Sequence, residues 1–247
     1  MTDIFIDIQQ KSYAAKGSAK RAVVIENLQL SLKSHEFVCL VGSSGCGKTT
    51  LLNSIAGLDS DFAGKILVGQ QNMNPKIGYV FQNPRLLPWR TVRENIELAV
   101  EKTPASAEAI DNLLKIMQLD TVQQVYPEHL SLGMSRRVAI IRAFATNPDV
   151  LLMDEPFVSL DPPTARQVRN LLIHLWKQRP HTILFVTHDL REAIALADKL
   201  VFLSPSPMQI ICEIPVTLPR TQRDNDSAIE AFRQQLLTQH PSIRTLL

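Results

Sequence analysis

A glycine-rich turn early in the chain carries residues suited to binding a polyphosphate. Residues 42–49 read Gly-Ser-Ser-Gly-Cys-Gly-Lys-Thr, between an apolar segment, 37–41, and a helical segment, 48–56. Glycines let backbone N–H groups and the start of a helix face an anion, while Lys48 reaches the terminal phosphates and Thr49 binds Mg²⁺. A turn that binds nothing is the alternative, but a strand and a helix stand where phosphate binding requires them. The residues expected to hold a nucleotide here are Gly42, Ser43, Ser44, Gly45, Cys46, Gly47, Lys48, Thr49 and Thr50.

Two acidic residues follow a second apolar segment. Asp154 and Glu155 come directly after residues 150–153, which read Val-Leu-Leu-Met. A magnesium nucleotide needs a carboxylate at the carboxyl end of a buried strand. We therefore expect Asp154 to hold Mg²⁺, directly or through water, and Glu155 to act as the general base on an attacking water. The alternative is a strand that ends in two solvated acids, which the nearby phosphate-binding pattern disfavours.

Apolar and helical segments that alternate along the chain must position these side chains. The predicted strands are residues 4–8, 23–32, 36–41, 65–68, 77–81, 150–153, 182–186 and 199–203, with 65–68 and 77–81 read as a pair. The predicted helices are residues 48–56, 164–177 and 190–197, followed by an amphipathic segment at 229–237. Strands that alternate with helices predict a parallel sheet with crossover connections.

The character of the chain changes between residues 91 and 146, where helical patterns dominate. An inserted helical subdomain explains this change, and a chain of 247 residues has room for it. We therefore expect three parts. They are an α/β nucleotide-binding core at 1–84 and 147–217, a helical subdomain at 85–146, and a C-terminal extension at 218–247.

Composition and charge narrow the class of protein. The chain is 45% hydrophobic and 20% charged, which is typical of a folded globular protein. Its 26 basic and 24 acidic residues give a net charge of +2, so no large basic field indicates nucleic acid as a partner. The apolar stretches fall far short of the ~20 residues that span a bilayer. The N-terminus lacks the basic region and apolar core of a signal peptide, which favours a cytoplasmic location.

Further segments accompany the phosphate turn and the acidic pair. They are Gln82-Asn83-Pro84, Leu130-Ser131-Leu132-Gly133-Met134, residues 136–143, Pro156-Phe157, Ser159-Leu160-Asp161 and Thr187-His188-Asp189. In this order and spacing they resemble the ABC-type ATPases along nearly the whole chain. The resemblance implies a P-loop NTPase (RecA-like) core with a mainly parallel sheet, an N-terminal antiparallel β subdomain and an inserted helical subdomain. It also implies ATP and Mg²⁺ as the ligands.

The resemblance further implies roles for residues outside the phosphate turn. Gln82 would sense Mg²⁺ and the attacking water, and His188 would hydrogen-bond the γ-phosphate. Ser131 and Gly133, at the start of a helix, would contact the γ-phosphate held by an opposite subunit, so each site would need two chains. Asp161 would help to tie the two subunits together.

One aromatic residue stands where the resemblance implies adenine binding. Tyr13 lies where these ATPases usually place an aromatic side chain that stacks on the base. A plain surface tyrosine is the alternative.

A narrower resemblance involves two segments, residues 83–95 and 218–224. Both are similar to the nitrate, sulfonate and taurine branch of importer ATPases. In that branch Leu86, Leu87 and Trp89 would border a groove that receives a coupling helix of a polytopic membrane permease. These three residues could instead fill the core of the helical subdomain. The partners implied are permease subunits, a second identical or related ATPase subunit and, indirectly, a solute-binding protein, with the chain on the inner face of the cell membrane.

Two residues depart from the usual signature. Leu132 stands where glycine is usual, and Met134 where glutamine is frequent, although methionine is familiar in this branch. The leucine is expected to slow hydrolysis rather than to abolish it. Two further readings stay open beside a transport motor: a weakly hydrolysing subunit paired with a more active one, and a soluble ABC ATPase used in assembly or repair. The transported solute is not encoded in these motifs.

Overall fold

The computed structural model of the chain describes residues 3–14, 21–69 and 75–246. Contacts between residues divide the chain into two compact units. One, here the phosphate-loop unit, comprises Met1–Asn74 and Thr182–Leu247, and the other, here the helical unit, comprises Pro75–His181. The three parts expected above were defined by their type of secondary structure, whereas these two units are defined by contacts between residues. The three-part division therefore stays a prediction.

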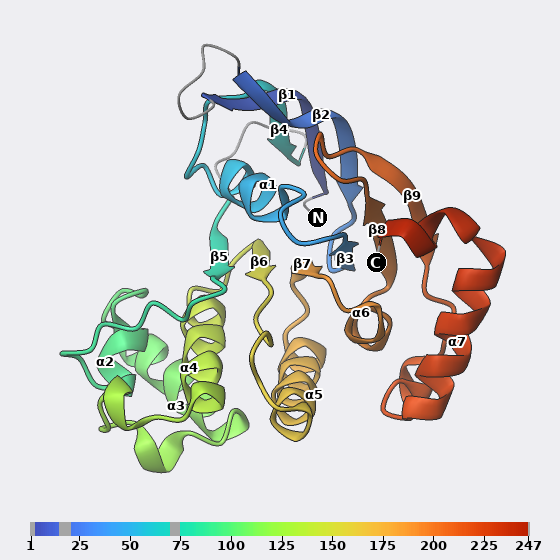
Figure 1. Cartoon of the computed structure of the whole chain (residues 1–247). Coiled ribbons are helices and arrows are strands. Elements are labelled where there is room, and N and C mark those ends of the chain that lie inside the picture. The colour runs from blue at the N-terminus through green and yellow to red at the C-terminus, as the bar shows by residue number, and fades with distance from the viewer. Residues whose placement is uncertain (1–2, 15–20, 70–74, 247) are drawn as a thin grey trace. The chain divides into compact units, whose positions relative to one another are not determined.

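An antiparallel sheet in the phosphate-loop unit has the strand order β2-β1-β4 (Figure 1). Its strands are β1 (Ile4–Ala14), β2 (Arg21–Leu32) and β4 (Ala63–Val68). Alternate residues of β1 are buried, and Ile4, Ile6 and Ile8 pair with buried leucines of β2. This period-two burial is typical of a sheet with one face on the core. The predicted antiparallel subdomain is therefore confirmed.

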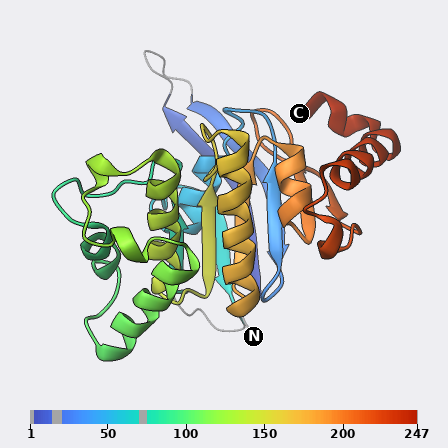
Figure 2. The same cartoon turned by 90° about the horizontal axis from the view of Figure 1, so that it is seen from below.

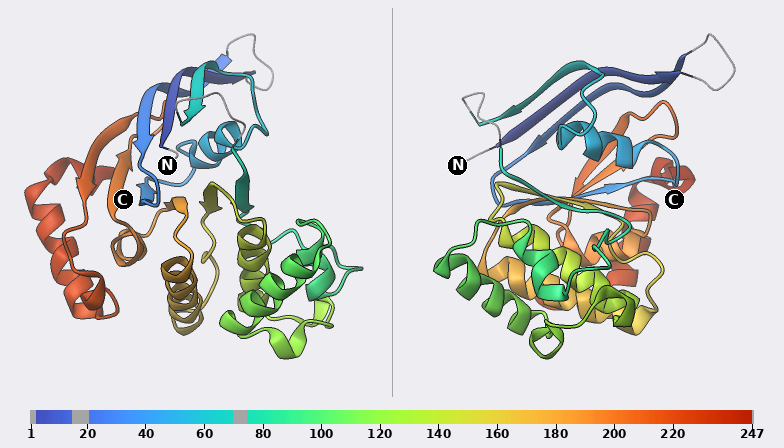
Figure 3. Two further views of the ribbon diagram at one scale, coloured as in Figure 1. Left: turned by 180° about the vertical axis from the view of Figure 1, so that it is seen from behind. Right: turned by 90° about the vertical axis from the view of Figure 1, so that its left-hand side faces the viewer.

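A second sheet contributes four strands to this unit, in the order β7-β3-β8-β9. They are β3 (Phe37–Val41), β7 (Thr182–Thr187), β8 (Lys199–Leu203) and β9 (Ile210–Pro215). β3 is parallel to both β7 and β8, and every residue of β3 and β7 is buried. α1 (Lys48–Ile55) lies next to the antiparallel sheet, and α6 (Leu190–Leu196) connects β7 to β8 (Figure 3).

The C-terminal part of the chain belongs to the same unit. α7 (Asp226–Gln239) packs beside α6 (Figure 2) and buries Ile229, Phe232 and Leu236, as the amphipathic pattern predicts. Short 3₁₀ helices lie before and after it, at Arg220–Gln222 and Pro241–Leu246.

A buried arginine holds the segment that leads into α7. The guanidinium of Arg223 donates to the backbone oxygens of Ala197, Leu218 and Val216 at 2.6, 2.9 and 3.3 Å. Burial lowers its pKa to about 10. The second segment of the importer resemblance, 218–224, therefore has a structural role in anchoring this end of the chain.

The helical unit contains a parallel pair of strands and the remaining helices. The strands are β5 (Ile77–Val80) and β6 (Val150–Asp154), and the helices are α2 (Val92–Glu97), α3 (Pro104–Ile116), α4 (Leu132–Ala145) and α5 (Pro162–Gln178), with 3₁₀ turns at Asp120–Val122 and Pro127–His129. α4 contacts α2, α3 and α5 and buries most of its residues. The helical character predicted for residues 91–146 is confirmed.

One expectation about the strands was wrong, and one strand was missed. Residues 65–68 and 77–81 do not pair with each other, because β4 pairs with β1 and β5 pairs with β6. β9 was not predicted, because its sequence, Ile-Ile-Cys-Glu-Ile-Pro, does not alternate apolar and polar residues, although its burial does alternate at the end of the sheet. Among the residues that the structure describes, no helix is both long and apolar enough to cross a membrane.

Candidate nucleoside triphosphate site

The predicted phosphate turn joins a buried strand to a helix, as its chemistry requires. β3 ends at Val41 and α1 begins at Lys48. Gly45 and Gly47 have φ angles of +81° and +114°, in the region that favours glycine. A Cβ at Gly47 would also lie 2.8 Å from Cγ1 of Val24. Glycine is therefore required twice over at position 47, by backbone conformation and by close packing.

The ammonium group of Lys48 is held by the turn itself. Its Nζ donates to the backbone oxygens of Gly42 and Ser43 at 2.8 and 2.9 Å, and the side chain is buried. A buried cation costs free energy unless anionic or dipolar groups surround it. The lysine and the left-handed glycines thus fit a polyphosphate. Among the described residues no group of three or more His, Cys, Asp and Glu side chains could hold a metal by itself.

His188, the residue predicted to contact the γ-phosphate, lies in a loop that starts at the same sheet edge as the phosphate turn. β3 and β7 are parallel with Val41 opposite Thr187, so both loops follow the carboxyl ends of neighbouring strands. His188 is exposed. Asp189 caps α6 by accepting from the backbone N of Arg191 at 2.8 Å, which fixes the turn after the histidine.

Tyr13 also belongs to the phosphate-loop unit, near the end of β1. Its ring is exposed, and its hydroxyl donates to Oδ2 of Asp59 at 2.7 Å. Burial raises the pKa of this hydroxyl, and the bond to Asp59 raises the pKa further. A hydrogen bond with the side chain of Thr50, in the first turn of α1, acts in the opposite direction.

The helical unit brings the other predicted catalytic residues to one edge. β5 and β6 are parallel with Val80 opposite Met153, so Gln82 and the Asp154–Glu155 pair follow the carboxyl ends of adjacent strands. Asp154 is buried, Glu155 is half-buried and Gln82 is exposed.

Backbone strain and electrostatics mark the same edge. Glu155 has a φ of +42°, an unusual conformation for a residue with a side chain and one that is often found at functional sites. Burial raises the pKa of Tyr79 on β5, and the nearby charge of Asp154 raises that pKa further.

The predicted signature residues lie at the start of α4. Ser131 is the N-cap of the helix, and its hydroxyl oxygen accepts from the backbone N of Met134 at 3.2 Å. Because the hydroxyl accepts this bond, its own proton can be donated to a ligand. Leu132, the first helical residue, is 43% exposed.

Gly133 packs against the first turn of α5. A Cβ at this position would lie 2.6 Å from Cγ2 of Thr164. Asp161 caps the same turn, because its Oδ2 accepts from the backbone N of Thr164 at 3.1 Å. Hydrogen bonds from Thr164 lower the pKa of the Asp161 carboxyl. The signature and the segment of Asp161 are therefore in direct contact.

A residue that the sequence did not single out connects these segments. Arg136 of α4 is buried and donates to the backbone oxygens of Phe81, Gln82 and Val158. Burial lowers the pKa of its guanidinium. The one signal in the sequence was an arginine pair preceding the apolar run of α4, which gives no indication of which guanidinium turns inward.

The predicted partner-binding residues differ in exposure. Trp89 is 70% exposed, whereas Leu86 and Leu87 are half-buried. The alternative that the tryptophan fills the core of the helical subdomain is therefore wrong. Asn95 is fully buried below this segment. Its Oδ1 accepts from the backbone N of Leu87 at 2.7 Å, and its Nδ2 donates to the oxygens of Leu87 and Arg90 at 3.1 and 2.9 Å. The tryptophan is thus presented on an anchored segment.

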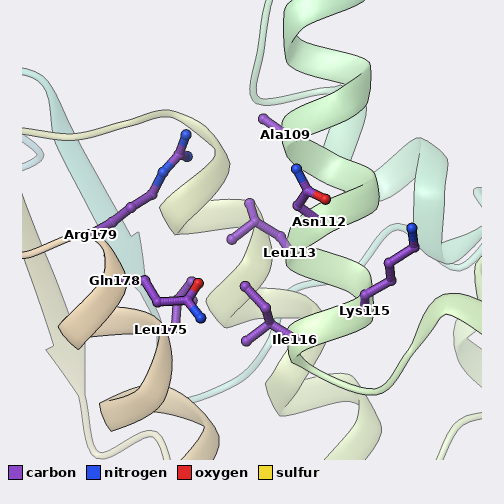
Figure 4. Close-up of a pocket in the computed structure, with 8 residues that line it drawn as sticks. All are labelled: Ala109, Asn112, Leu113, Lys115, Ile116, Leu175, Gln178 and Arg179. Atoms are coloured by element: carbon purple, nitrogen blue, oxygen red, sulfur yellow. The ribbon is translucent and has the colours of Figure 1, made fainter.

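A cavity of about 300 Å³ in the helical unit lies apart from these residues (Figure 4). It opens between α3 and α5, over the apolar side chains of Leu113, Ile116 and Leu175, with Arg179 at its rim. It contains none of the predicted site residues.

Comparisons with known proteins agree with the motifs. A family model described as ABC transporter matches residues 25–158. The aliphatic sulfonates import ATP-binding protein of Bacillus subtilis (strain 168) is 38% identical over 240 residues, which cover 96% of this chain and 93% of the relative. The nitrate import ATP-binding protein of Synechococcus elongatus (strain ATCC 33912 / PCC 7942 / FACHB-805) is 40% identical over 210 residues, covering 80% and 77%.

Solved structures extend the similarity to the fold. A dimeric structure of a post-hydrolysis state of an ATP-binding cassette bound to ADP and Pi has a TM-score of 0.72 and 28% identity. The match covers 87% of this chain and 99% of that one.

Proposed function

The chain belongs to the ABC transporter family of ATP-binding proteins, and on that premise we propose that it energises an importer of small solutes of the sulfonate, nitrate or taurine kind. The observation that carries the proposal is similarity, over most of each chain, to two importer ATPases, one named for aliphatic sulfonates and one for nitrate, at 38% and 40% identity. The chain is an ATPase. Its solute and its membrane partners are the proposed part.

ATP binding begins at the phosphate turn in this proposal. The backbone N–H groups of residues 42–50 and the ammonium of Lys48 would face the phosphates, and Tyr13 would stack on the adenine. Mg²⁺ would be held by Thr49, Asp154 and Gln82, and it supplies charge neutralisation for the phosphate oxygens.

Hydrolysis needs a base, an orienting group and a contact to the leaving phosphate. Glu155 would accept the proton of the attacking water, and Gln82 would orient that water. His188 would hydrogen-bond the γ-phosphate. The shared sheet edges of β3 with β7, and of β5 with β6, support this assignment, because each edge gathers loops that carry these residues.

A second chain would complete each site. Ser131 and Gly133 would contact the γ-phosphate bound by the opposite subunit, and Asp161 would help to hold the two subunits together. The N-cap geometry of Ser131 supports this role, since it sets a hydroxyl and the N-terminus of α4 at one point. ATP would then close the dimer, and hydrolysis would release it.

Attachment to a permease would use the segment of Leu86, Leu87 and Trp89. An exposed tryptophan on an anchored backbone is suited to an interface, where large aromatic residues often contribute most of the binding free energy. The chain would thereby sit on the cytoplasmic face of a membrane.

The test is to isolate the tagged chain from membranes of its own cells and to measure solute uptake. We expect a polytopic membrane protein to accompany the chain, and uptake of a sulfonate, taurine or nitrate to be lost when the chain is deleted. Trp89→Ala should reduce both while the protein stays folded. A chain that purifies without any membrane partner, from cells whose uptake is unchanged by its deletion, would favour a soluble ATPase of assembly or repair.

One observation favours a second candidate, a weakly hydrolysing subunit paired with a more active one. Leu132 places an exposed leucine at the first position of the signature helix. Steady-state hydrolysis by the isolated chain separates the two, because the weak subunit would need a partner ATPase to reach a normal rate.

A further inference from the structure

A buried lysine, an aspartate and an exposed tyrosine form one network in the phosphate-loop unit. Nζ of Lys11 lies 2.7 Å from Oδ1 of Asp59 and 2.7 Å from the backbone oxygen of Asp61. The hydroxyl of Tyr13 donates to Oδ2 of the same Asp59 carboxylate, also at 2.7 Å. Both carboxylate oxygens are therefore used, one by the lysine and the other by the tyrosine.

The lysine also covers one face of the tyrosine ring. Its Nζ lies over the ring of Tyr13, 4.5 Å from the centroid. An ammonium group in this position is attracted by the negative face of the ring. Since Lys11 occupies that face, a planar ligand can stack only on the other one. The ring is 41% exposed, so it still offers surface to a ligand.

The oppositely charged groups of the network stabilise one another. Lys11 is only 1% exposed, and a buried ammonium is costly unless it is paired. The hydrogen bond from Lys11 lowers the pKa of Asp59, and the bond from Tyr13 lowers it further. The carboxylate therefore stays ionised at neutral pH and holds both partners.

We propose that Lys11 and Asp59 are positioning residues that fix the ring of Tyr13 for stacking on adenine. The inference rests on the adenine-binding role of Tyr13 in the proposed function. Asp59 tethers the hydroxyl and Lys11 covers one face, so the ring is restrained before the nucleotide arrives. Less conformational entropy is then lost on binding, which increases affinity for the base without any change at the phosphates.

The test separates base binding from phosphate binding. Affinities for ATP and for inorganic tripolyphosphate, both with Mg²⁺, are measured by titration calorimetry on the full chain. We expect Asp59→Asn to weaken ATP binding by about threefold, as loss of a hydrogen bond would, with tripolyphosphate affinity unchanged. The matched control is Asp61→Asn, which makes the same charge change on a more distant partner of Lys11. The Asp61 side chain is 76% exposed and its Oδ2 lies 3.9 Å from Nζ, and the backbone oxygen that Lys11 uses is kept.

Two further variants make the result decisive. Tyr13→Phe keeps the ring and removes the tether, so it should reproduce the loss seen with Asp59→Asn. Tyr13→Ala should weaken ATP binding by roughly tenfold if the ring stacks on the base. Thermal melting checks that each variant is folded. If Asp59→Asn does not fold, Tyr13→Phe tests the positioning role in its place.

Each remaining outcome contradicts a different part of the inference. If Tyr13→Ala weakens ATP binding but Asp59→Asn and Tyr13→Phe do not, the positioning role is overturned and the stacking role stands. If Tyr13→Ala binds ATP as the unchanged chain does, the stacking role fails and the inference fails with it. Equal losses for ATP and tripolyphosphate in Asp59→Asn would show that the network acts through the phosphate turn, which overturns the inference.

Discussion

Gly133 and Thr164 lie so close that the signature helix and α5 have no room for a side chain between them. A Cβ added at Gly133 would be 2.6 Å from Cγ2 of Thr164, inside the distance that any real Cβ contact keeps. Thr164 is also the residue whose backbone N is capped by Asp161. A change at the glycine is therefore felt directly by the segment proposed to join the two subunits.

Gly133→Ala should lower the free energy of unfolding by about 1–3 kcal/mol, because overpacking displaces neighbouring groups. Thr164→Ser removes the methyl group that would be struck and keeps the hydroxyl. We expect the double variant to recover most of the loss, while Thr164→Ser alone changes little. Urea unfolding of the four proteins measures the coupling, and strictly additive effects would show that these two residues do not clash.

Arg136 should matter more to turnover than its neighbour Arg137 does. Arg136 donates to backbone oxygens of Phe81, Gln82 and Val158, whereas Arg137 donates to Met117, outside the motif segments. A lysine has no planar fork and cannot hold several carbonyl oxygens at once. Arg136→Lys is therefore expected to lower kcat by about tenfold, consistent with the sensitivity of catalysis to small displacements. Similar kcat values in Arg136→Lys and the matched Arg137→Lys would contradict this.

Leu132→Gly should raise the ATPase rate of the purified chain severalfold. The leucine occupies space near the start of α4 that glycine would leave open, and a displacement of about 1 Å can cost on the order of 100-fold in rate. The affinity of the monomer for nucleotide should change little, since this residue would serve the opposite subunit's site. Steady-state hydrolysis at several protein concentrations provides the measurement. An equal or lower rate in the folded variant would mean that the leucine is a tolerated variation.

The Lys11–Asp59 pair should give the chain a pH-dependent part of its stability. The folded-state pKa of Asp59 is lowered from its usual value of 3.8, so its contribution is present above that value and is lost as the pH falls through the lower, folded pKa. Asp59→Asn should cost about 1 kcal/mol of unfolding free energy at pH 7. The difference from the unchanged chain should shrink below pH 3.8. A difference that stays constant from pH 7 to pH 3, or one matched by Asp61→Asn, would contradict the pairing.

The sequence predicted the parts of the fold in which local pattern and chemistry agree. The position of the glycine-rich turn was predicted correctly, because a fully buried strand, β3, precedes its glycines and a helix follows them. The acidic pair was placed correctly at the end of β6 for the same reason.

Other features depend on pairing between distant residues, which a single sequence does not display. Local order could not assign β4 and β5 to different sheets, and β9 is a partly exposed strand whose sequence does not alternate apolar and polar residues. Lys11 and Asp59 lie 48 residues apart, so their pairing had no local signal.

The two-chain site is tested most directly by mixing two inactive variants. Glu155→Gln lacks the base of its own site but offers an intact signature, while Ser131→Arg blocks the signature but keeps its own phosphate turn and base. Each protein alone should hydrolyse ATP at a small fraction of the normal rate. Mixed before ATP is added, they should recover hydrolysis, because a mixed dimer contains one site whose residues are all intact. A mixture no more active than its separate components, or full activity of Ser131→Arg alone, would contradict hydrolysis between two chains.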